Sequence, residues 1–185
     1  MTPAGETARV LLVYASTHGH TVKIAERLAA AVRADGAEVD LRAVADAAEA
    51  NPLDYDGAIV AGSLHQGRHQ AELEDWVKHH HLALADRPSA FVSVSLTAAE
   101  DSDEARVATR DCIDDFLDDT GWTPTRMLAV AGALQYREYD VFTRVLMRLM
   151  MSQGGHPTDI SQDHEYTDWD ALARFGRDFA RLVSG

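Results

Sequence analysis

Near its N-terminus the chain joins a wholly apolar segment to an amphipathic one through a single short loop. Residues 10–14 read Val-Leu-Leu-Val-Tyr, which is typical of a strand buried on both faces. After the loop at 16–21, apolar side chains recur at helical spacing, at Ile24, Leu28 and Val32. A helix that begins directly after a buried strand presents its unpaired N–H groups and its positive dipole end there. This arrangement predicts an α/β fold with an anion site in the loop.

The loop consists of hydroxyl, glycine and histidine residues rather than of lysine or arginine. It reads Ser16, Thr17, His18, Gly19, His20, Thr21. The Gly-Lys-Ser/Thr ending of a Walker loop is absent, and so is the Gly-x-Gly-x-x-Gly pattern of a dinucleotide-binding loop. Hydroxyl groups add donors to the helix N–H groups, and the glycine lets the backbone approach an anion without a Cβ between them. A capped surface turn is the alternative interpretation.

Strand-like and helix-like segments alternate along the rest of the chain, as in a parallel sheet covered on both faces. Near-continuous apolar runs predict buried strands at 10–14, 58–62, 90–96 and 127–134. Alternating apolar and charged residues predict an edge strand at 37–44. Helical spacing predicts helices at 21–35, 70–85, 103–119, 140–152 and 169–183. We expect one domain over residues 1–185, with residues 1–8 as a flexible N-terminus.

The composition narrows the possible partners and the compartment. The net charge of −13 argues against non-specific binding of nucleic acid. The one cysteine, Cys112, leaves no internal disulfide, and we expect a core position for it beside Ala108 and Phe116. The N-terminus has no signal-peptide pattern, and no apolar run is as long as a membrane span. We therefore expect a cytoplasmic protein.

The loop and its flanks resemble the flavodoxin phosphate loop. The matching positions are Leu12, Val13, Tyr14, Ser16, Gly19, Thr21, Ala25 and Leu28. The resemblance implies a flavodoxin-like, doubly wound, five-stranded parallel sheet of strand order 2-1-3-4-5. It also implies non-covalently bound FMN, with its monophosphate held by hydroxyls and amides. In such a sheet the ligand lies at the carboxyl ends of strands 1 and 3, where the winding reverses.

Four loops at the carboxyl ends of the strands are expected to converge on this cofactor. The residues expected to bind it are Ser16, Thr17, His18, Gly19, His20, Thr21, Ser63, Leu64, His65, Gly67, Ser95, Leu96, Thr97, Gln135 and Tyr136. His65 is the candidate to tune flavin N1 or to move a proton. With Arg68 and His69 it favours two-electron chemistry, because cationic groups stabilise the anionic reduced flavin. No metal site is expected.

Motifs in the second half of the chain resemble the flavodoxin-type, menaquinone-dependent protoporphyrinogen IX dehydrogenase family. The most specific are Ala-Gly-Ala-Leu-x-Tyr at 131–136 and Tyr-Thr-Asp-Trp at 166–169. The resemblance, which runs from about residue 9 to 183, implies oxidation of a porphyrinogen with electrons passed to a membrane quinone. The acidic stretch at 98–104 departs from the family pattern. The alternatives are a flavodoxin-type electron carrier and an NAD(P)H:quinone reductase of the same fold.

The segment 136–155 is apolar almost all round and carries a cationic stripe. Arg144 and Arg148 are spaced i,i+4, and Arg137 precedes them. We consider these arginines as contacts for the propionates of a porphyrinogen, on a surface that also touches the membrane where the quinone dissolves. The alternative is an ordinary covering helix whose arginines are solvated.

Two further patterns have structural interpretations. His79, His80 and His81 point in different directions from a predicted helix, so we expect a solvated helix end rather than a metal site. Asp168 is expected either to cap the last helix or to be an acid in its first turn, with Trp169 at the start of the helix. The apolar residues expected to pack inward from that helix are Leu172, Phe175, Phe179 and Leu182.

Overall fold

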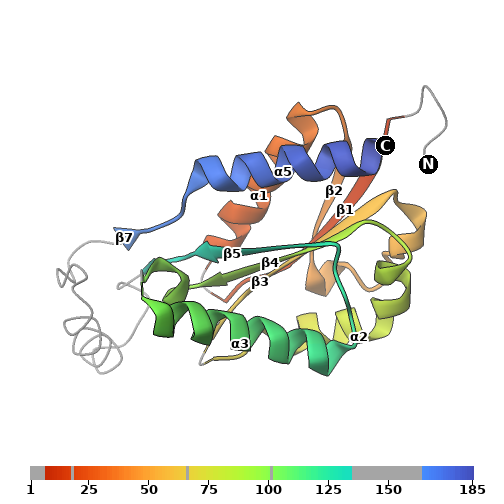
Figure 1. Cartoon of the computed structure of the whole chain (residues 1–185). Helices are drawn as coiled ribbons and strands as arrows, with labels where there is room; N and C mark the ends of the chain where they lie inside the picture. Colours follow the sequence, from red (N-terminus) through yellow and green to blue (C-terminus); the bar gives the residue numbers. More distant parts are fainter. Residues whose placement is uncertain (1–6, 18, 66, 101, 135–163) are drawn as a thin grey trace.

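The computed structural model describes residues 7–17, 19–65, 67–100, 102–134 and 164–185. At its centre is a five-stranded sheet of order β2-β1-β3-β4-β5, in which every neighbouring pair is parallel (Figure 1). The strands are β1 (Arg9–Ala15), β2 (Glu38–Ala43), β3 (Gly57–Ser63), β4 (Ser89–Ser95) and β5 (Arg126–Ala131). The parallel sheet and the strand order predicted from the sequence are confirmed.

Helices cover both faces of the sheet, and Figure 1 shows α1 and α5 on one side and α2 and α3 on the other. Their bounds are α1 (His20–Ala34), α2 (Ala71–Ala85), α3 (Asp103–Thr120) and α5 (Trp169–Ser184). Single 3-10 turns lie at η1 (Val44–Asp46), η2 (Pro52–Asp54) and η3 (Thr97–Ala99). The helix predicted at 140–152 lies outside the described residues. None of the helices in the described part of the chain is long and apolar enough to cross a membrane.

Strand β1 separates two apolar cores, which explains why its residues 10–15 are all apolar. Val10 and Leu12 face the core under α1 and α5, whereas Leu11 and Val13 face the core under α2 and α3. All four side chains are fully buried. Successive side chains of a strand point to opposite faces of the sheet. A strand covered on both faces therefore needs apolar residues at odd and at even positions.

Helix α5 packs closely against α1 at a glycine. A Cβ at Gly176 would lie 2.9 Å from the Cβ of Ala31 and 3.2 Å from the backbone oxygen of Leu28. Asp168 is the N-cap of α5, the first of its two predicted roles, since its Oδ1 accepts a hydrogen bond of 2.9 Å from the N–H of Ala171. This packing fixes the start of α5 beside the start of α1.

The inward face of α5 differs from the prediction at one position. Leu172 and Phe179 are buried, and Phe175 packs against the same core. Leu182 is exposed, so its predicted inward position is wrong, and Val183 takes that place. The last turn of a helix can meet the core through either of two adjacent residues, and sequence spacing alone does not choose between them.

The predicted strand at 127–134 is too long. It divides at Gly132, after which Ala133–Leu134 forms β6 and pairs antiparallel with β7 (His164–Glu165). The N–H of Gly132 donates to the oxygen of Ser95 at 3.0 Å, and its own oxygen accepts from the N–H of Tyr166 at 3.2 Å. The chain therefore changes its pairing partner at Gly132, and a continuous apolar run does not show such a change.

Helix α3 also corrects two expectations. Its buried residues are Ala105, Thr109, Ile113, Phe116 and Thr120. Ala108 is exposed and Cys112 only half-buried, so Cys112 lies at the margin of the core. Burial, and to a lesser extent the nearby Asp115 and Asp111, raise the pKa of the Cys112 thiol.

The acidic stretch at 98–104 has a structural explanation in the start of α3. The Oγ of Ser102 caps the helix by accepting from the N–H of Ala105 at 3.1 Å. Asp103 and Glu104 lie in the first turn, where the positive end of the helix dipole stabilises carboxylates. Asp103 also pairs with Arg106 at 2.7 Å. These charges complete a helix end as well as contributing to the net charge.

Candidate functional site

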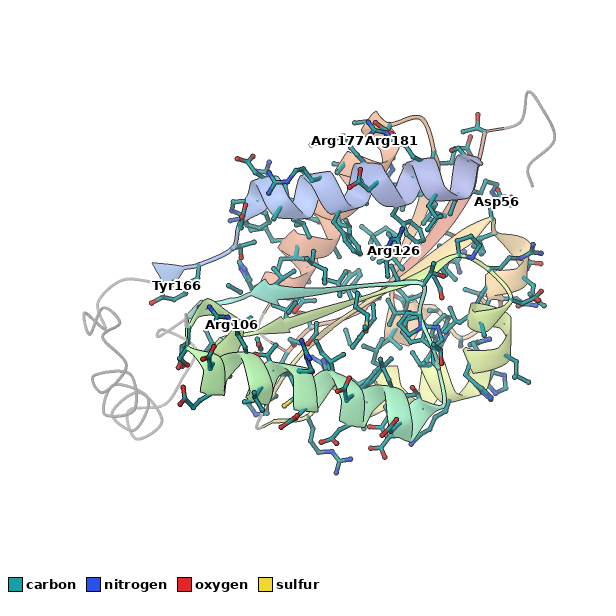
Figure 2. All side chains as sticks on the ribbon, viewed as in Figure 1. Asp56, Arg106, Arg126, Tyr166, Arg177 and Arg181 are labelled. Carbon is teal, nitrogen blue, oxygen red and sulfur yellow. The ribbon has the colours of Figure 1, made fainter. Side chains whose placement is uncertain are left out.

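A small cavity of about 70 Å³ lies at the carboxyl ends of β1, β3 and β4. The residues that line it are Ser16, Thr17, His20, Thr21, Ser63, Leu64, His65, Val94, Ser95, Leu96 and Gly132. Figure 2 shows Tyr166 and Arg106 at this end of the molecule and Asp56 at the opposite end. A larger hollow of about 610 Å³, between α3 and β5, shares none of these lining residues.

The loop after β1 turns into α1 through a glycine in the left-handed conformation. Gly19 caps α1 with a φ of 83°, a conformation that side chains other than glycine adopt only with strain. Its N–H donates to the Oγ of Ser16 at 2.9 Å. A Cβ at Gly19 would meet no atom within 4 Å, so the backbone angle is what requires glycine here.

The positive end of α1 is not neutralised by the helix's own sequence. The first turn of α1 contains no acidic residue, whereas the first turns of α2, α3 and α5 each contain at least one. Because the first N–H groups of a helix lack carbonyl partners, this end can accommodate an anion. Hydroxyl groups at the ends of three strands surround it, so the cavity can bind a phosphate or a carboxylate.

The donor in the hydrogen bond between His20 and Thr167 follows from a proton count. The hydroxyl of Thr167 donates to the oxygen of Ala131 at 2.7 Å. It has no second proton, so the contact of 2.9 Å to His20 must be a donation from the Nε2–H of the imidazole. Thr167 thus orients a side chain that lines the cavity. Trp169 extends this contact, since its ring centroid lies 6.1 Å from that of His20 and 5.0 Å from the Nζ of Lys23.

The loop after β3 turns back on itself and presents His65 at the cavity. The N–H of His65 donates to the oxygen of Arg68 at 2.8 Å, and the N–H of Arg68 donates back at 3.2 Å. Gly67 takes a φ of 80° within this turn. The N–H of Leu64 donates to the oxygen of Val94 at 2.8 Å, which joins the loop to β4. His65 is therefore an exposed side chain on a tight, anchored turn.

Comparison with known proteins identifies the family. A family model described as "Flavodoxin domain" matches residues 11–161. The chain belongs to the flavodoxin family. It is 35% identical to a protoporphyrinogen IX dehydrogenase (quinone) of Leishmania major, over 97% of this chain and 78% of that protein. It is 31% identical to the protein of that name from Escherichia coli K12, over 95% of this chain and 96% of the relative.

A solved structure supports the fold. Oxidised flavodoxin 1 from Bacillus cereus superposes with a TM-score of 0.56 at 17% sequence identity, over 94% of this chain and 98% of that one. The predicted flavodoxin-like fold is therefore confirmed. The predicted relationship to the quinone-dependent protoporphyrinogen IX dehydrogenases is confirmed by the sequence relatives.

Nine of the residues expected to bind the cofactor line this cavity, namely Ser16, Thr17, His20, Thr21, Ser63, Leu64, His65, Ser95 and Leu96. Gly19 caps α1 and does not line it. Gly67 and Thr97 instead line two other hollows. Those that lie outside the described residues are His18, Gln135, Tyr136, Arg137, Arg144 and Arg148. The contact of Thr167 with His20 was not expected from the sequence, although Thr167 stands in the Tyr-Thr-Asp-Trp element.

Two cationic groups expected near the flavin lie elsewhere. Arg68 pairs with Asp119 on α3 at 3.1 Å. His69 is buried, bonds to the Oγ of Ser93 at 3.0 Å and contacts the rings of Phe91 and Phe116. Burial lowers the pKa of His69 to about 4, so it is a neutral core residue. Of the three groups invoked for two-electron chemistry, only His65 lines the cavity.

The triple-histidine segment lies within α2 and not at a free helix end. His79 is exposed, whereas the ring of His80 lies 4.6 Å from that of Trp76. Burial, with a smaller contribution from His79, lowers the pKa of His80. Among the described residues, no group of three or more His, Cys, Asp or Glu side chains is arranged to hold a metal ion.

The buried His69 predicts a pH dependence of stability. Its pKa is about 4 in the folded chain and 6.5 ordinarily, so between these values the unfolded chain binds more protons. The free energy of unfolding should fall as the pH is lowered from about 6.5 to about 4, by about 3 kcal/mol for this group. Urea unfolding of wild type and His69→Gln across this range measures it. His79→Gln, at an exposed position, should keep the wild-type slope; an unchanged slope in His69→Gln would contradict the assignment.

The proton count at Thr167 predicts a fixed tautomer. In wild type the neutral imidazole of His20 should carry its proton on Nε2, as two-bond ¹⁵N–¹H correlation spectra report. Thr167→Val leaves His20 and the oxygen of Ala131 without their shared hydroxyl partner. It should therefore abolish the preference for the Nε2–H tautomer and lower the free energy of unfolding by about 1–3 kcal/mol. Thr167→Ser should retain both properties. An Nδ1–H tautomer in wild type would show that the donor assignment is wrong.

Proposed function

We propose that the chain binds FMN non-covalently, with the monophosphate in the hydroxyl-lined cavity at the start of α1. The observation that carries this proposal is the combination of a left-handed Gly19 cap, a first helical turn without acids and hydroxyls at the ends of three strands. A volume of about 70 Å³ suits a phosphate-sized group, so the ring would lie at the mouth, beside Leu64, His65 and Leu96. Membership of the flavodoxin family supports the same cofactor.

We propose further that the chain is a flavin-dependent dehydrogenase that oxidises protoporphyrinogen IX and reduces menaquinone. The names of the two sequence relatives, at 31–35% identity over nearly the whole chain, support this donor and a quinone acceptor. Bound FMN would supply the hydride-accepting and electron-passing chemistry. Formation of the aromatic porphyrin drives the reaction, so the chain's main task is to hold the reactants in position.

Each group of side chains has a separate task in this proposal. The hydroxyls and the start of α1 anchor the cofactor, and Leu64 and Leu96 exclude water from one edge of its ring. His65, exposed at the mouth, tunes N1 or moves a proton. Arg137, Arg144 and Arg148 stay candidates for contact with the propionates and with the cytoplasmic face of the membrane, where the quinone is dissolved.

A flavodoxin-type electron carrier is the second candidate. Its supporting observation is the fold itself, which matches a flavodoxin structure over nearly its whole length. Carriers of this type usually sandwich the flavin ring between aromatic side chains. The loops after β3 and β4, at 64–69 and 96–102, contain no Trp, Tyr or Phe. This composition favours the dehydrogenase over the carrier.

Porphyrin fluorescence tests the proposed reaction. FMN-loaded protein is mixed with protoporphyrinogen IX under low oxygen, with and without a menaquinone analogue. Porphyrin fluorescence should grow only when protein and quinone are both present, because the flavin must be reoxidised before each further round. Protein that binds FMN but produces no porphyrin above the protein-free control would contradict the dehydrogenase.

Anaerobic reduction separates the remaining alternatives in the same preparation. A large, stable semiquinone yield would support the electron carrier. Rapid bleaching of the flavin by NADPH would support an NAD(P)H:quinone reductase. The dehydrogenase predicts bleaching by the porphyrinogen and slow bleaching by NADPH.

A further inference from the structure

Four hydroxyl groups that line the cavity all accept hydrogen bonds from N–H donors of the protein. The N–H of Gly19 donates to Ser16 at 2.9 Å, and the N–H of Ala98 donates to Ser95 at 3.1 Å. The other two hydroxyls are those of Thr17 and Ser63. Both accept from the same group, the Nε2 of Gln70, at 3.1 Å and 2.5 Å. A hydroxyl whose oxygen already accepts such a bond has its own O–H left to donate.

Gln70 stands behind the cavity and does not line it. It is the residue that precedes α2, and its side chain reaches the loop after β1 and the end of β3 at once. Thr17 and Ser63 do line the cavity, so Gln70 can influence a ligand through these two hydroxyls. Gln70 therefore differs from a binding residue, because it contacts the lining hydroxyls and not the cavity itself.

The orientation of the Gln70 amide decides which way the two hydroxyls face. With Nε2 toward the hydroxyls, the buried Oε1 is the atom without a partner. In the reverse orientation, both hydroxyls would donate to Oε1 and would turn their lone pairs toward the cavity. The NH₂ group of Gln70, with its two N–H donors, would then be buried without acceptors. Buried donors without partners are rarer than buried carbonyl oxygens without partners. The observed orientation is therefore the favourable one.

We propose that Gln70 is a positioning residue that determines the selectivity of the site for a phosphorylated flavin over the unphosphorylated one. By occupying the acceptor sites of Thr17 and Ser63, it directs their protons into the cavity, where they can donate to an anion. Hydroxyls that faced the cavity with lone pairs would repel the same anion. This inference rests on the proposed function, since it assumes that the cavity takes the phosphate of FMN.

The substitution Gln70→Glu tests this polarity with little change of shape. An ionised carboxylate can only accept, so Thr17 and Ser63 must donate toward residue 70 and away from the cavity. Titration calorimetry measures the Kd of each protein for FMN and for riboflavin. In Gln70→Glu we expect the Kd for FMN to rise about tenfold or more, since charge-assisted hydrogen bonds are lost, and that for riboflavin to stay within about twofold.

Ala71→Glu is the matched control for charge. It places a carboxylate one residue along the chain, at an exposed position, and leaves the Gln70 amide in place. Its FMN Kd should stay within about twofold of wild type. Gln70→Asn is the second variant, because it retains the amide but is too short to reach both hydroxyls. We expect a smaller loss of FMN affinity for it, again without an effect on riboflavin.

A double-mutant cycle with Thr17→Val shows whether Gln70 acts through Thr17. The two effects on the FMN Kd should be less than additive, because Thr17→Val removes one of the groups that Gln70 orients. Additive effects would overturn the proposal, as would equal losses of FMN and riboflavin affinity or an FMN loss in Ala71→Glu as large as in Gln70→Glu.

The proposed function fails in a different way. If wild type binds FMN no more tightly than riboflavin, then the phosphate site itself is refuted and this inference falls with it. If wild type prefers FMN and Gln70→Glu keeps that preference, then the phosphate site stands and only the role of Gln70 is overturned.

Discussion

An α-helix cannot pair its own first N–H groups, and this structure is organised around that deficit at the start of α1. Strand β1 lies inside the sheet, between β2 and β3, and the chain passes from its end through a short loop directly into the helix. A left-handed Gly19 makes the turn, and no carboxylate in the first turn neutralises the positive end. The hydroxyls at the ends of the neighbouring strands add hydrogen-bond donors beside this helix end.

The rest of the fold holds these groups in position next to one another. Parallel pairing aligns the ends of β1, β3 and β4, and backbone bonds from Leu64 and Gly132 link the loops that follow. On the other side, the close contact of α5 with α1 at Gly176 brings Thr167 to His20. The C-terminal element that is diagnostic in the sequence thus has a physical role, which is to orient a side chain at the cavity.

The buried parts of this fold could be predicted because they leave a simple record in the sequence. A strand such as β1, covered on both faces, must be apolar at every buried position. In a helix that packs against a core, the apolar residues must recur at the helical period. The break at Gly132 could not be predicted, because an apolar run does not reveal which partner a strand pairs with. Leu182 and Cys112 were misplaced for a similar reason, since adjacent positions on a helix compete for the core.

The site was predictable where chemistry and spacing coincide, as in the loop after β1. The site was not predictable where function depends on the direction in which a side chain points. His65, Arg68 and His69 are close neighbours in sequence, yet one lines the cavity, one pairs with Asp119 and one is a neutral core residue. The role proposed for Gln70 depends on which end of an amide faces two hydroxyls, and a residue's identity does not contain that information.

The measurement that tests this account most directly is a crystal structure of the chain with FMN bound. The account predicts that the phosphate lies within hydrogen-bond distance of the Ser16 and Thr17 hydroxyls and of the first N–H groups of α1, with the ring beside Leu64 and Leu96. A phosphate in solvent, or FMN in the hollow between α3 and β5 with the α1 cavity empty, would contradict it.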